Sequence, residues 1–180
     1  MIDLLADLNV SLSEEQNQQF NKYLQLLLEY NQKFNLTSIV EPKDVKIKHF
    51  YDSLLLLNTP YWQGEGSVLD LGTGAGFPGV PLKILFPDVE LVLMDAVAKK
   101  IGFLNILAAE LGLEKVSAVQ MRAEDAGRSP LYRESFDFLV TRALAPMPVL
   151  AEYCLPLVKV GGYVAAYKGP NWQEEGSAGE

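Results

Sequence analysis

Apolar and polar residues follow two different patterns along the chain, and the change falls near residue 64. In the first part, apolar residues recur at helical spacing after Ser13, a candidate N-cap with Gln16 three residues later. This pattern predicts a helix that ends within residues 31–35. A second helix is expected to begin at Pro42, which suits a first-turn position, and to run to Leu57.

Strands and helices alternate from residue 67 onward. The predicted strands cover residues 68–71, 89–94, 116–120, 136–141 and 162–168, and the predicted helices cover residues 80–85, 98–111 and 149–157. Because parallel strands need crossover connections, this alternation predicts an α/β fold with a mostly parallel sheet and helices on both faces. We therefore expect an N-terminal helical extension over residues 1–63, packed on a core of residues 64–180.

The composition is that of an ordinary globular protein, with 49% apolar and 21% charged residues in a chain of 180. No apolar run approaches the ~20 residues of a membrane span. Asp3 and Asp7 are unlike the basic start of a secretory signal, and the single cysteine, Cys154, cannot form an internal disulfide. These features predict a cytoplasmic protein without a membrane contact.

Charge and ligand chemistry narrow the function classes further. The net charge of −8 argues against a protein that coats nucleic acid nonspecifically, although it leaves room for a local basic face. One histidine and one cysteine cannot furnish the usual ligand set of a transition metal, so no metal site is predicted.

The most informative segment is the turn at residues 70–79, which carries four glycines between a strand and a helix. In parallel sheets, ligands bind beyond the carboxyl ends of the strands. Glycine lets the backbone approach a ligand closely, and amide N–H groups at a helix start point toward it. The turn therefore indicates a nucleotide-like ligand, the alternative being an ordinary tight turn.

Two alignments of the glycines suggest different ligands. Gly74, Gly76 and Gly79 spell the dinucleotide fingerprint, but that frame contains Pro78 and begins further from the strand than usual. The other frame starts with Asp70 at the strand end and continues through Gly72, Gly74 and Gly76. It suits S-adenosylmethionine (SAM), because the amino and sulfonium groups of SAM are cationic and a nearby carboxylate favours them.

Three further strand ends carry candidate binding residues. Asp95 lies 25 residues after Asp70 and could accept hydrogen bonds from both ribose hydroxyls, in a SAM or an NAD site alike, or be a solvated carboxylate. Ala123 and Glu124 follow the third strand, where they could read an adenine edge or simply begin a helix. Arg142 follows the fourth strand and is a candidate for substrate or cofactor contact, or for a surface ion pair.

Nearly the whole chain resembles a known family, the bacterial guanine-N7 methyltransferases of small-subunit ribosomal RNA, also called glucose-inhibited division protein B. The Gly-Phe-Pro-Gly extension of the glycine turn and the Arg-Ala-Glu after the third strand are distinctive together. The segments that carry the resemblance cover residues 35–39, 49–54, 70–81, 95–100, 122–124, 141–143 and 168–169.

The resemblance implies a SAM-dependent enzyme with a Rossmann-like fold that methylates N7 of one guanine in 16S ribosomal RNA. Carried over by motif, Gly72 and Phe77 would line the SAM pocket, with Ala123 and Glu124 at the adenosine. Asp95 would hold the ribose, and Arg142 would lie at the methionine or acceptor side. No general base is expected, since N7 has a free lone pair and carries no proton.

Two features depart from the family pattern. Members often have Lys-Arg where this chain has Lys99-Lys100, and lysine lacks the bidentate fork that arginine offers a phosphate. Members also continue well past the Lys168-Gly169 pair, so we expect C-terminal strands to be missing here and the fifth strand to be an open edge.

Contacts with RNA are expected from two small basic clusters, one with Lys46 and Lys48 and the other with Lys99 and Lys100. We hypothesise that they border the cleft and meet phosphates, the alternative being solvated helix faces. The expected partner is 16S ribosomal RNA or the small ribosomal subunit, with no stable protein partner evident.

Two other function classes stay open from the residues alone. A SAM-dependent methyltransferase that acts on a small molecule would suit the acidic charge. An NAD-binding oxidoreductase would use the dinucleotide frame of the glycines, although the chain lacks an evident base for hydride transfer.

Overall fold

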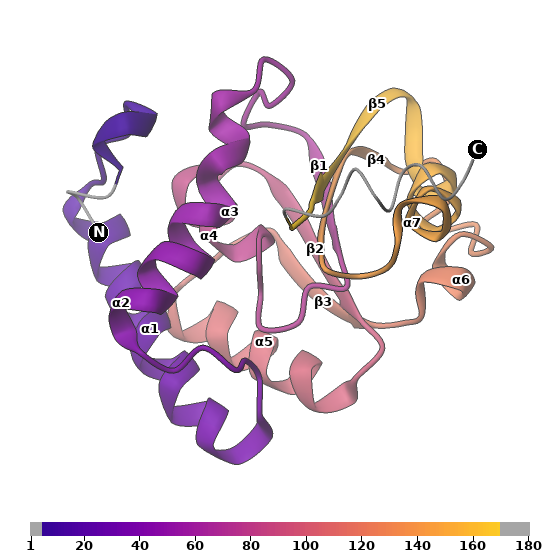
Figure 1. The fold of residues 1–180 in the computed structure, drawn as a ribbon. Coiled ribbons are helices and arrows are strands. Elements are labelled where there is room, and N and C mark those ends of the chain that lie inside the picture. Colours follow the sequence, from indigo (N-terminus) through magenta and orange to yellow (C-terminus); the bar gives the residue numbers. More distant parts are fainter. Residues whose placement is uncertain (1–4, 170–180) are drawn as a thin grey trace.

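The five strands form one parallel sheet in the order β3-β2-β1-β4-β5 in the computed structural model, which describes residues 5–169 (Figure 1). This confirms the predicted α/β class and the predicted parallel pairing. The strands are β1 (Ser67–Leu71), β2 (Glu90–Asp95), β3 (Val116–Gln120), β4 (Phe136–Arg142) and β5 (Val158–Tyr167).

Helices cover both faces of this sheet, as the alternation predicted. One face carries α4 (Gly79–Leu85) and α5 (Ala98–Glu110), and the other carries α6 (Ala123–Ala126) and α7 (Met147–Cys154) (Figure 1). The buried apolar side chains accordingly form two clusters, one on each side of the sheet. Among the residues that the structure describes, no helix is long and apolar enough to cross a membrane.

The long helix α1 (Glu14–Phe34) lies across α4 and α5 (Figure 1). The predicted capping box is present, because Ser13 Oγ accepts a hydrogen bond from the backbone N–H of Gln16 and the Gln16 side chain accepts one from Ser13 N–H. The Gln16 side chain also donates to the carbonyl of Ile84, near the end of α4. The cap of α1 thereby joins this helix to the core.

The segment from Pro42 to Asn58 is not the single regular helix that the sequence pattern predicted. It consists of α2 (Pro42–Val45), a π-helical turn (Lys46–Tyr51), α3 (Asp52–Leu54) and a 3₁₀ turn (Leu55–Asn58). The spacing of apolar residues cannot distinguish α, π and 3₁₀ turns, since the extra residue of a π turn shifts that spacing only locally. Such turns are frequent at functional sites.

Strand β5 begins four residues earlier than predicted. Val158 already pairs with Phe136, after which a register shift precedes the regular pairing that starts at Tyr163. A Cβ on Gly162 would lie only 2.7 Å from the carbonyl oxygen of Asp137, so glycine permits a close backbone approach here. β5 is an edge strand of the described sheet, and Val160 on it is 95% exposed.

The two parts of the chain share one apolar cluster. Phe20, Tyr23 and Phe50 of the extension belong to the same buried cluster as Leu93 and Phe103 of the core. The boundary near residue 64 stays a prediction about domain organisation. The extension therefore packs directly on the core and helps to support it.

Tyr23→Phe tests this support. The Tyr23 hydroxyl is fully buried and donates a 2.7 Å hydrogen bond to the carbonyl of Ala75 in the glycine turn. Removing it leaves a buried carbonyl unpaired, so we expect the free energy of unfolding to fall by about 1–3 kcal/mol. Urea denaturation measures this change.

Tyr30→Phe on the same helix is the matched control. The Tyr30 ring packs against Phe103, and its hydroxyl makes no hydrogen bond within residues 5–169. Its unfolding free energy should stay within about 0.5 kcal/mol of the wild type. Equal losses in the two variants would mean that the Tyr23 hydrogen bond does not support the turn.

Candidate active site

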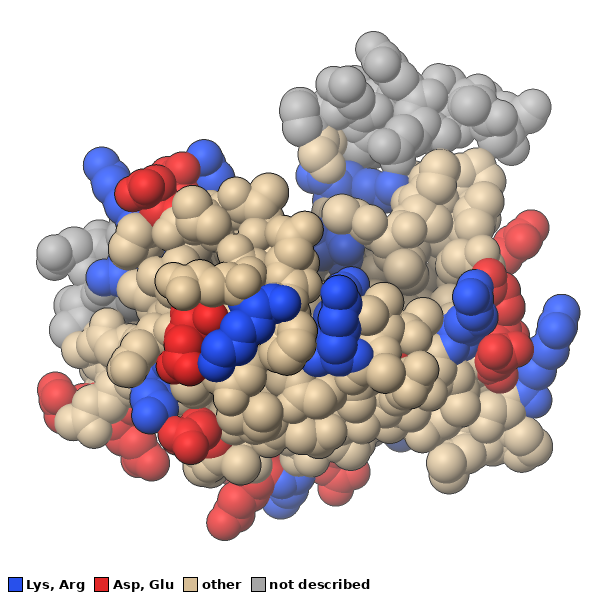
Figure 2. Space-filling model, turned by 90° about the horizontal axis from the view of Figure 1, so that it is seen from below, with Lys and Arg blue, Asp and Glu red and all other residues tan. Residues whose placement is uncertain are grey.

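Two neighbouring cavities lie at the carboxyl ends of the strands. The smaller, of about 310 Å³, is lined by the ends of β1, β2 and β3 together with the start of α6. The larger, of about 890 Å³, lies between the π turn, the end of β4 and the end of β5. Ala143 and Leu144 line both, so the short segment after β4 forms their common wall. Figure 2 views this end of the molecule, where Lys and Arg side chains border a central hollow.

Asp70 organises the glycine turn from inside the protein. Its carboxylate is fully buried, and Oδ2 accepts hydrogen bonds of 2.7 Å from Thr73 Oγ1 and from Gly79 N–H. Oδ1 is buried without a hydrogen-bond partner. Burial raises the pKa of Asp70 to about 7, against the opposing effect of the two hydrogen bonds. A positive charge bound near this carboxyl group would therefore lower its pKa and favour its ionised form.

The glycines of the turn face different surroundings. A Cβ on Gly79 would lie 2.7 Å from Asp70 Oδ2, and one on Gly76 would lie 2.7 Å from Tyr23 Oη, so both face the protein interior. Gly74 has a φ of +60° and open space where a Cβ would lie. Gly72 lines the smaller cavity. In the frame that begins with Asp70, Gly72 lines the cavity and Gly74 faces open space, whereas Gly76, which both frames share, faces the interior together with Gly79.

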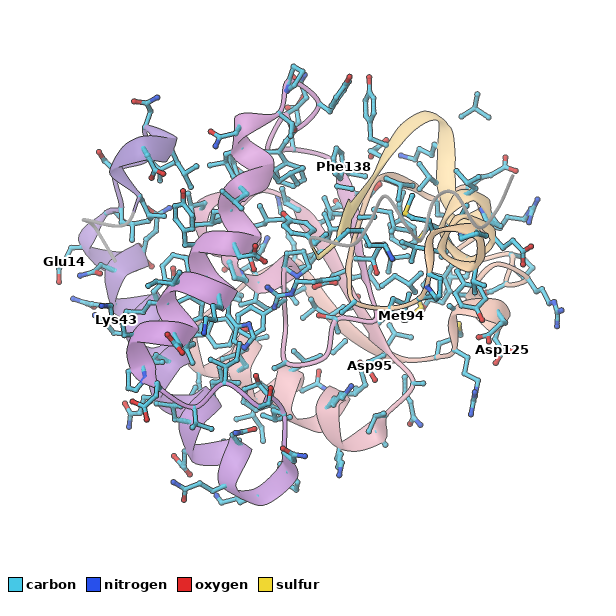
Figure 3. All side chains as sticks on the ribbon, in the orientation of Figure 1. Glu14, Lys43, Met94, Asp95, Asp125 and Phe138 are labelled. Carbon is cyan, nitrogen blue, oxygen red and sulfur yellow. The ribbon has the colours of Figure 1, made fainter. Side chains whose placement is uncertain are left out.

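Asp95 lies at the carboxyl end of β2, on the wall of the smaller cavity (Figure 3). Its Oδ2 accepts hydrogen bonds from Gly74 N–H at 3.0 Å and from Lys100 Nζ at 3.1 Å, and its Oδ1 accepts one from Val97 N–H at 3.0 Å. The two oxygens of a carboxylate offer about four acceptor positions. Asp95 can therefore accept a further bond from a ligand hydroxyl while it holds the glycine turn.

The opposite wall of the smaller cavity comes from the start of α6. Ala123 and Glu124 both line it, which is where the sequence analysis placed an adenosine contact. Glu124 Oε1 accepts a 3.0 Å hydrogen bond from the hydroxyl of Tyr153 on α7. The pKa of Glu124 lies below its usual value, first through a bond with its own backbone N–H and then through Tyr153. The ring of Tyr153 therefore also belongs to this wall of the smaller cavity.

Arg142 ends β4 and lines the larger cavity. Its Nη1 donates to Asp52 Oδ2 at 3.0 Å and to the carbonyl of Lys48 at 3.2 Å. Its Nη2 lies 3.2 Å from His49 Nδ1, and its Cζ lies 5.1 Å from the centre of the Phe77 ring. The guanidinium is thus fixed by the π-helical segment and the glycine turn together, rather than by an ordinary surface ion pair.

The side chain of Phe77 lies in the interior. Its ring is 5% exposed and stacks on His49 and Tyr23, beneath the Arg142 guanidinium, and it is not among the residues that line the two cavities. The ring of Phe77 therefore supports Arg142 from below, and a contact of Phe77 with SAM stays a prediction.

The four lysines expected to contact RNA have different positions. Lys48 lines the larger cavity, with its ammonium group 2.9 Å from Asp44 Oδ2. Lys100 lines the smaller cavity, where it pairs with Asp95 instead of extending from an outer face. Lys99 is exposed at the start of α5, and Lys46 is half-buried in the π turn.

Several lining residues were not singled out by sequence reasoning. Tyr153 and Leu144 belong to the smaller cavity, and Tyr51, Asp52 and Tyr167 to the larger one. Asp52 lies within a segment that resembles the known family, which was the available signal. Tyr153 lies on the apolar helix α7 and carries no such signal, because helical spacing does not show which side chain faces a neighbouring strand end.

The fold is the Rossmann-like α/β fold that solved SAM-dependent methyltransferases also have. A solved SAM-dependent methyltransferase of Aquifex aeolicus superposes with a TM-score of 0.54 at 22% identity, over 72% of this chain and 74% of that one. A putative SAM-dependent methyltransferase of Methanococcus maripaludis gives a TM-score of 0.56 at 15% identity, over 94% of this chain and 72% of that one. At these identities the likeness concerns the fold.

The sequence comparisons identify the family within this class. The family model "GidB: rRNA small subunit methyltransferase G" matches residues 16–180, and the chain belongs to this family. A relative named ribosomal RNA small subunit methyltransferase G from Alkaliphilus oremlandii is 54% identical over 93% of this chain and 70% of its own length. The relative of that name from Desulfitobacterium hafniense is 52% identical over 93% of this chain and 69% of its own length.

Gly79→Ala tests the packing of the glycine turn on Asp70. The added methyl group would meet Asp70 and Leu93 Cδ2 at 3.0 Å or less, so the turn must shift. Overpacking of this kind costs about 1–3 kcal/mol of unfolding free energy, which chemical denaturation measures.

Gly102→Ala is the matched control, because nothing lies within 4 Å of the position that its Cβ would take on α5. Alanine raises helix stability by up to about 1 kcal/mol, so this variant should be as stable as the wild type or more so. If Gly79→Ala were equally well tolerated, the close approach to Asp70 would not be a constraint on the turn.

Proposed function

We propose that this protein transfers the methyl group of SAM to N7 of a guanine in 16S ribosomal RNA. Family membership carries this proposal, and the cavities at the strand ends support it with a separate place for a cofactor and for an acceptor base. The smaller cavity is the proposed cofactor site, and the larger is the proposed acceptor site.

The residues around the smaller cavity fit SAM. Asp70 lies behind the turn and lines neither cavity, but among the described residues its Oδ1 has no hydrogen-bond partner, so a positive charge bound at the turn would favour its ionised form. Gly74 leaves open space for a close approach. We propose that Asp95 holds the ribose and that Ala123 and Glu124 contact the adenosine. A volume of about 310 Å³ lies at the lower end of the range of ~300–1,000 Å³ for small-molecule sites.

An NAD site fits the turn less well. In a dinucleotide site, the second glycine of the fingerprint lets the backbone approach the pyrophosphate. Here that glycine would be Gly76, whose missing side chain faces Tyr23 and Val80 inside the protein. Both frames contain Gly76, but the dinucleotide frame needs it beside the pyrophosphate, so its burial weighs against NAD.

Methylation of N7 needs positioning rather than proton transfer. When bound, SAM supplies a methyl group on a positively charged sulfur, and the N7 lone pair forms the new C–N bond as the C–S bond breaks. No proton leaves the guanine, so the site needs no general base. The protein's own residues then contribute by holding the two reactants in line, which is worth ~7–11 kcal/mol of the barrier.

Arg142 is the proposed positioning group at the acceptor side. Nη1 donates twice and Nη2 once to the surrounding protein, in a group with five N–H donors. The remaining donors can bind a carbonyl or carboxylate oxygen, such as guanine O6 or the cofactor carboxylate. We propose this role in place of any acid–base function.

The cavity walls also account for RNA binding by an acidic protein. Lys48, Arg142 and Lys168 line the larger cavity, and Lys100 and Arg122 line the smaller one. Cations thus gather at the strand ends, although the chain carries a net charge of −8 (Figure 2). We propose that this face, together with Lys46 and Lys99, meets the phosphates of 16S RNA in the cytoplasm, without a stable protein partner.

The first test is methylation of RNA transcripts. With radiolabelled SAM, we expect the label to enter 16S RNA and to be recovered as 7-methylguanosine after nuclease digestion. A transcript of the methylated region made with 7-deazaguanosine lacks N7 and should accept no label. Label in the 7-deaza transcript would contradict the N7 assignment, and label in small-molecule extracts but not in RNA would favour the other acceptor class.

The second test concerns the buried Asp70 carboxyl group. Its pKa is raised to about 7, and a bound cation favours the ionised form, so SAM binding should release protons near pH 6.5. Because a released proton favours binding at higher pH, the affinity for SAM should rise between pH 6 and pH 7.5. Calorimetry in two buffers of different ionisation enthalpy measures both effects.

Asp70→Asn provides the control for this proton release. It keeps an acceptor for Thr73 and Gly79 but has no ionisable group, so its SAM affinity should be flat over the same pH range. Equal pH dependence in both proteins would show that another group titrates on binding and that Asp70 does not sense the cofactor charge.

A further inference from the structure

The sole histidine of the chain belongs to the helical extension and lies between Thr37, just after α1, and Arg142. His49 belongs to the π turn, is 9% exposed, and stacks on the Phe77 ring with centroids 4.5 Å apart. Its Nδ1 lies 3.2 Å from Arg142 Nη2, and its Nε2 lies 2.9 Å from Thr37 Oγ1. Both ring nitrogens are therefore engaged, one toward the acceptor cavity and one toward the extension.

Hydrogen-bond chemistry decides which nitrogen carries the proton. A guanidinium only donates, so Nδ1 must accept from Arg142, and the proton of the neutral ring lies on Nε2. Nε2 then donates to Thr37 Oγ1, which also accepts a 3.1 Å hydrogen bond from Ile39 N–H. The imidazole is thereby held in one tautomer and one orientation.

Thr37 is itself fixed to the end of α1. Its backbone N–H donates to Asn31 Oδ1 at 2.8 Å, and its carbonyl accepts from Asn31 Nδ2 at 2.9 Å. A continuous chain of hydrogen bonds thus runs from Asn31 through Thr37 and His49 to Arg142. It joins residues that lie up to 111 positions apart in the sequence, since 142 − 31 = 111.

We propose that His49 is a positioning residue for methyl transfer: its neutral imidazole orients the Arg142 guanidinium and couples that orientation to the helical extension. The inference rests on the proposed function for its kinetic consequence. The geometry itself does not depend on which acceptor the enzyme uses.

The charges around the imidazole agree with a neutral ring. Burial first, and then the Arg142 guanidinium, lower the pKa of His49 to about 4. From the other packed elements, Tyr23 of α1 faces the same aromatic stack with its hydroxyl bound to Ala75, and Asp52 lies on the other side of Arg142. Protonation would remove the acceptor at Nδ1 and place two cations in contact.

Loss of this acceptor should free the guanidinium to turn without unfolding the protein. Asp52 and the Lys48 carbonyl would still bind Nη1, whereas Nη2 would lose its fixed partner. Misplacement of a positioning group by about 1 Å can cost ~100-fold in rate. The expected signature is thus a fall in kcat with little change in the affinity for SAM.

The presence of one histidine makes the direct test simple. In untagged protein labelled with ¹⁵N-histidine, the NMR spectrum at pH 7 should show a single neutral ring protonated at Nε2. Its pKa should lie below 5, and Arg142→Met should raise that pKa and weaken the tautomer preference. A ring protonated at Nδ1 or charged at pH 7, or one insensitive to Arg142→Met, would overturn the proposal whatever the enzyme methylates.

Kinetics provide the second test. His49→Phe keeps a ring for the Phe77 stack without an acceptor, and kcat should fall roughly 10–100-fold with a melting temperature close to that of the wild type. His49→Asn places an amide oxygen near the position of Nδ1 and should recover part of that loss. In the double variant with Arg142→Lys, His49→Phe should cause little additional loss, because the two residues act as one unit.

The outcomes separate this inference from the proposed function. If wild-type protein bound SAM but methylated no RNA, the proposed function would fail while the NMR result still tested the hydrogen-bond chain. If His49→Phe and His49→Asn reduced kcat and melting temperature in parallel, or if both left kcat unchanged, His49 would not be a positioning residue.

Discussion

The buried carboxylate of Asp70 is the constraint on which the site depends. It lies at the end of the central strand β1, where one oxygen binds both Thr73 and Gly79 and so ties the start of the glycine turn to the start of α4. A charged group in this position is unfavourable without partners, and the raised pKa is the consequence. The same constraint requires a glycine at position 79, because a Cβ would collide with the carboxylate.

Two further contacts hold the rest of the turn. Asp95 of β2 accepts a hydrogen bond from Gly74, and Tyr23 of α1 donates one to Ala75. The turn is therefore held by Asp70 of β1, by Asp95 of β2 and by Tyr23 of α1. Within the turn, Gly74 faces open space and Gly72 lines the smaller cavity, which lets a ligand approach the backbone closely.

Local patterns in the sequence accounted for the elements that depend on neighbouring residues. The capping box at Ser13, the alternation of strands and helices, and the glycine turn all follow from spacings of a few positions. The start of β5 was missed, because Gly161 and Gly162 interrupt the apolar pattern where the backbone approaches Asp137. The π turn was missed as well, since one inserted residue leaves the helical spacing of its neighbours unchanged.

The site was less predictable because its key contacts join distant parts of the chain. Asp95, Glu124 and Arg142 at the strand ends do line the two cavities, since the topology of a parallel sheet brings such positions together, and their contacts with a ligand stay predictions. No spacing indicates that His49 binds Arg142, 93 residues later, or that Phe77 lies beneath both. These contacts depend on how the extension packs, which hydrophobic patterns do not specify.

The packing of the extension also explains how a site without an acid–base group can catalyse a reaction. Phe20, Phe50, Tyr23, Phe77 and His49 form one series of ring contacts from the interior of the extension to the Arg142 guanidinium. The same series includes a residue of the glycine turn, so the proposed cofactor site and the proposed acceptor site share one packed support. When catalysis depends on holding two reactants in line, a shared rigid support is itself the contribution of the protein, and a separate, loosely attached extension could not provide it.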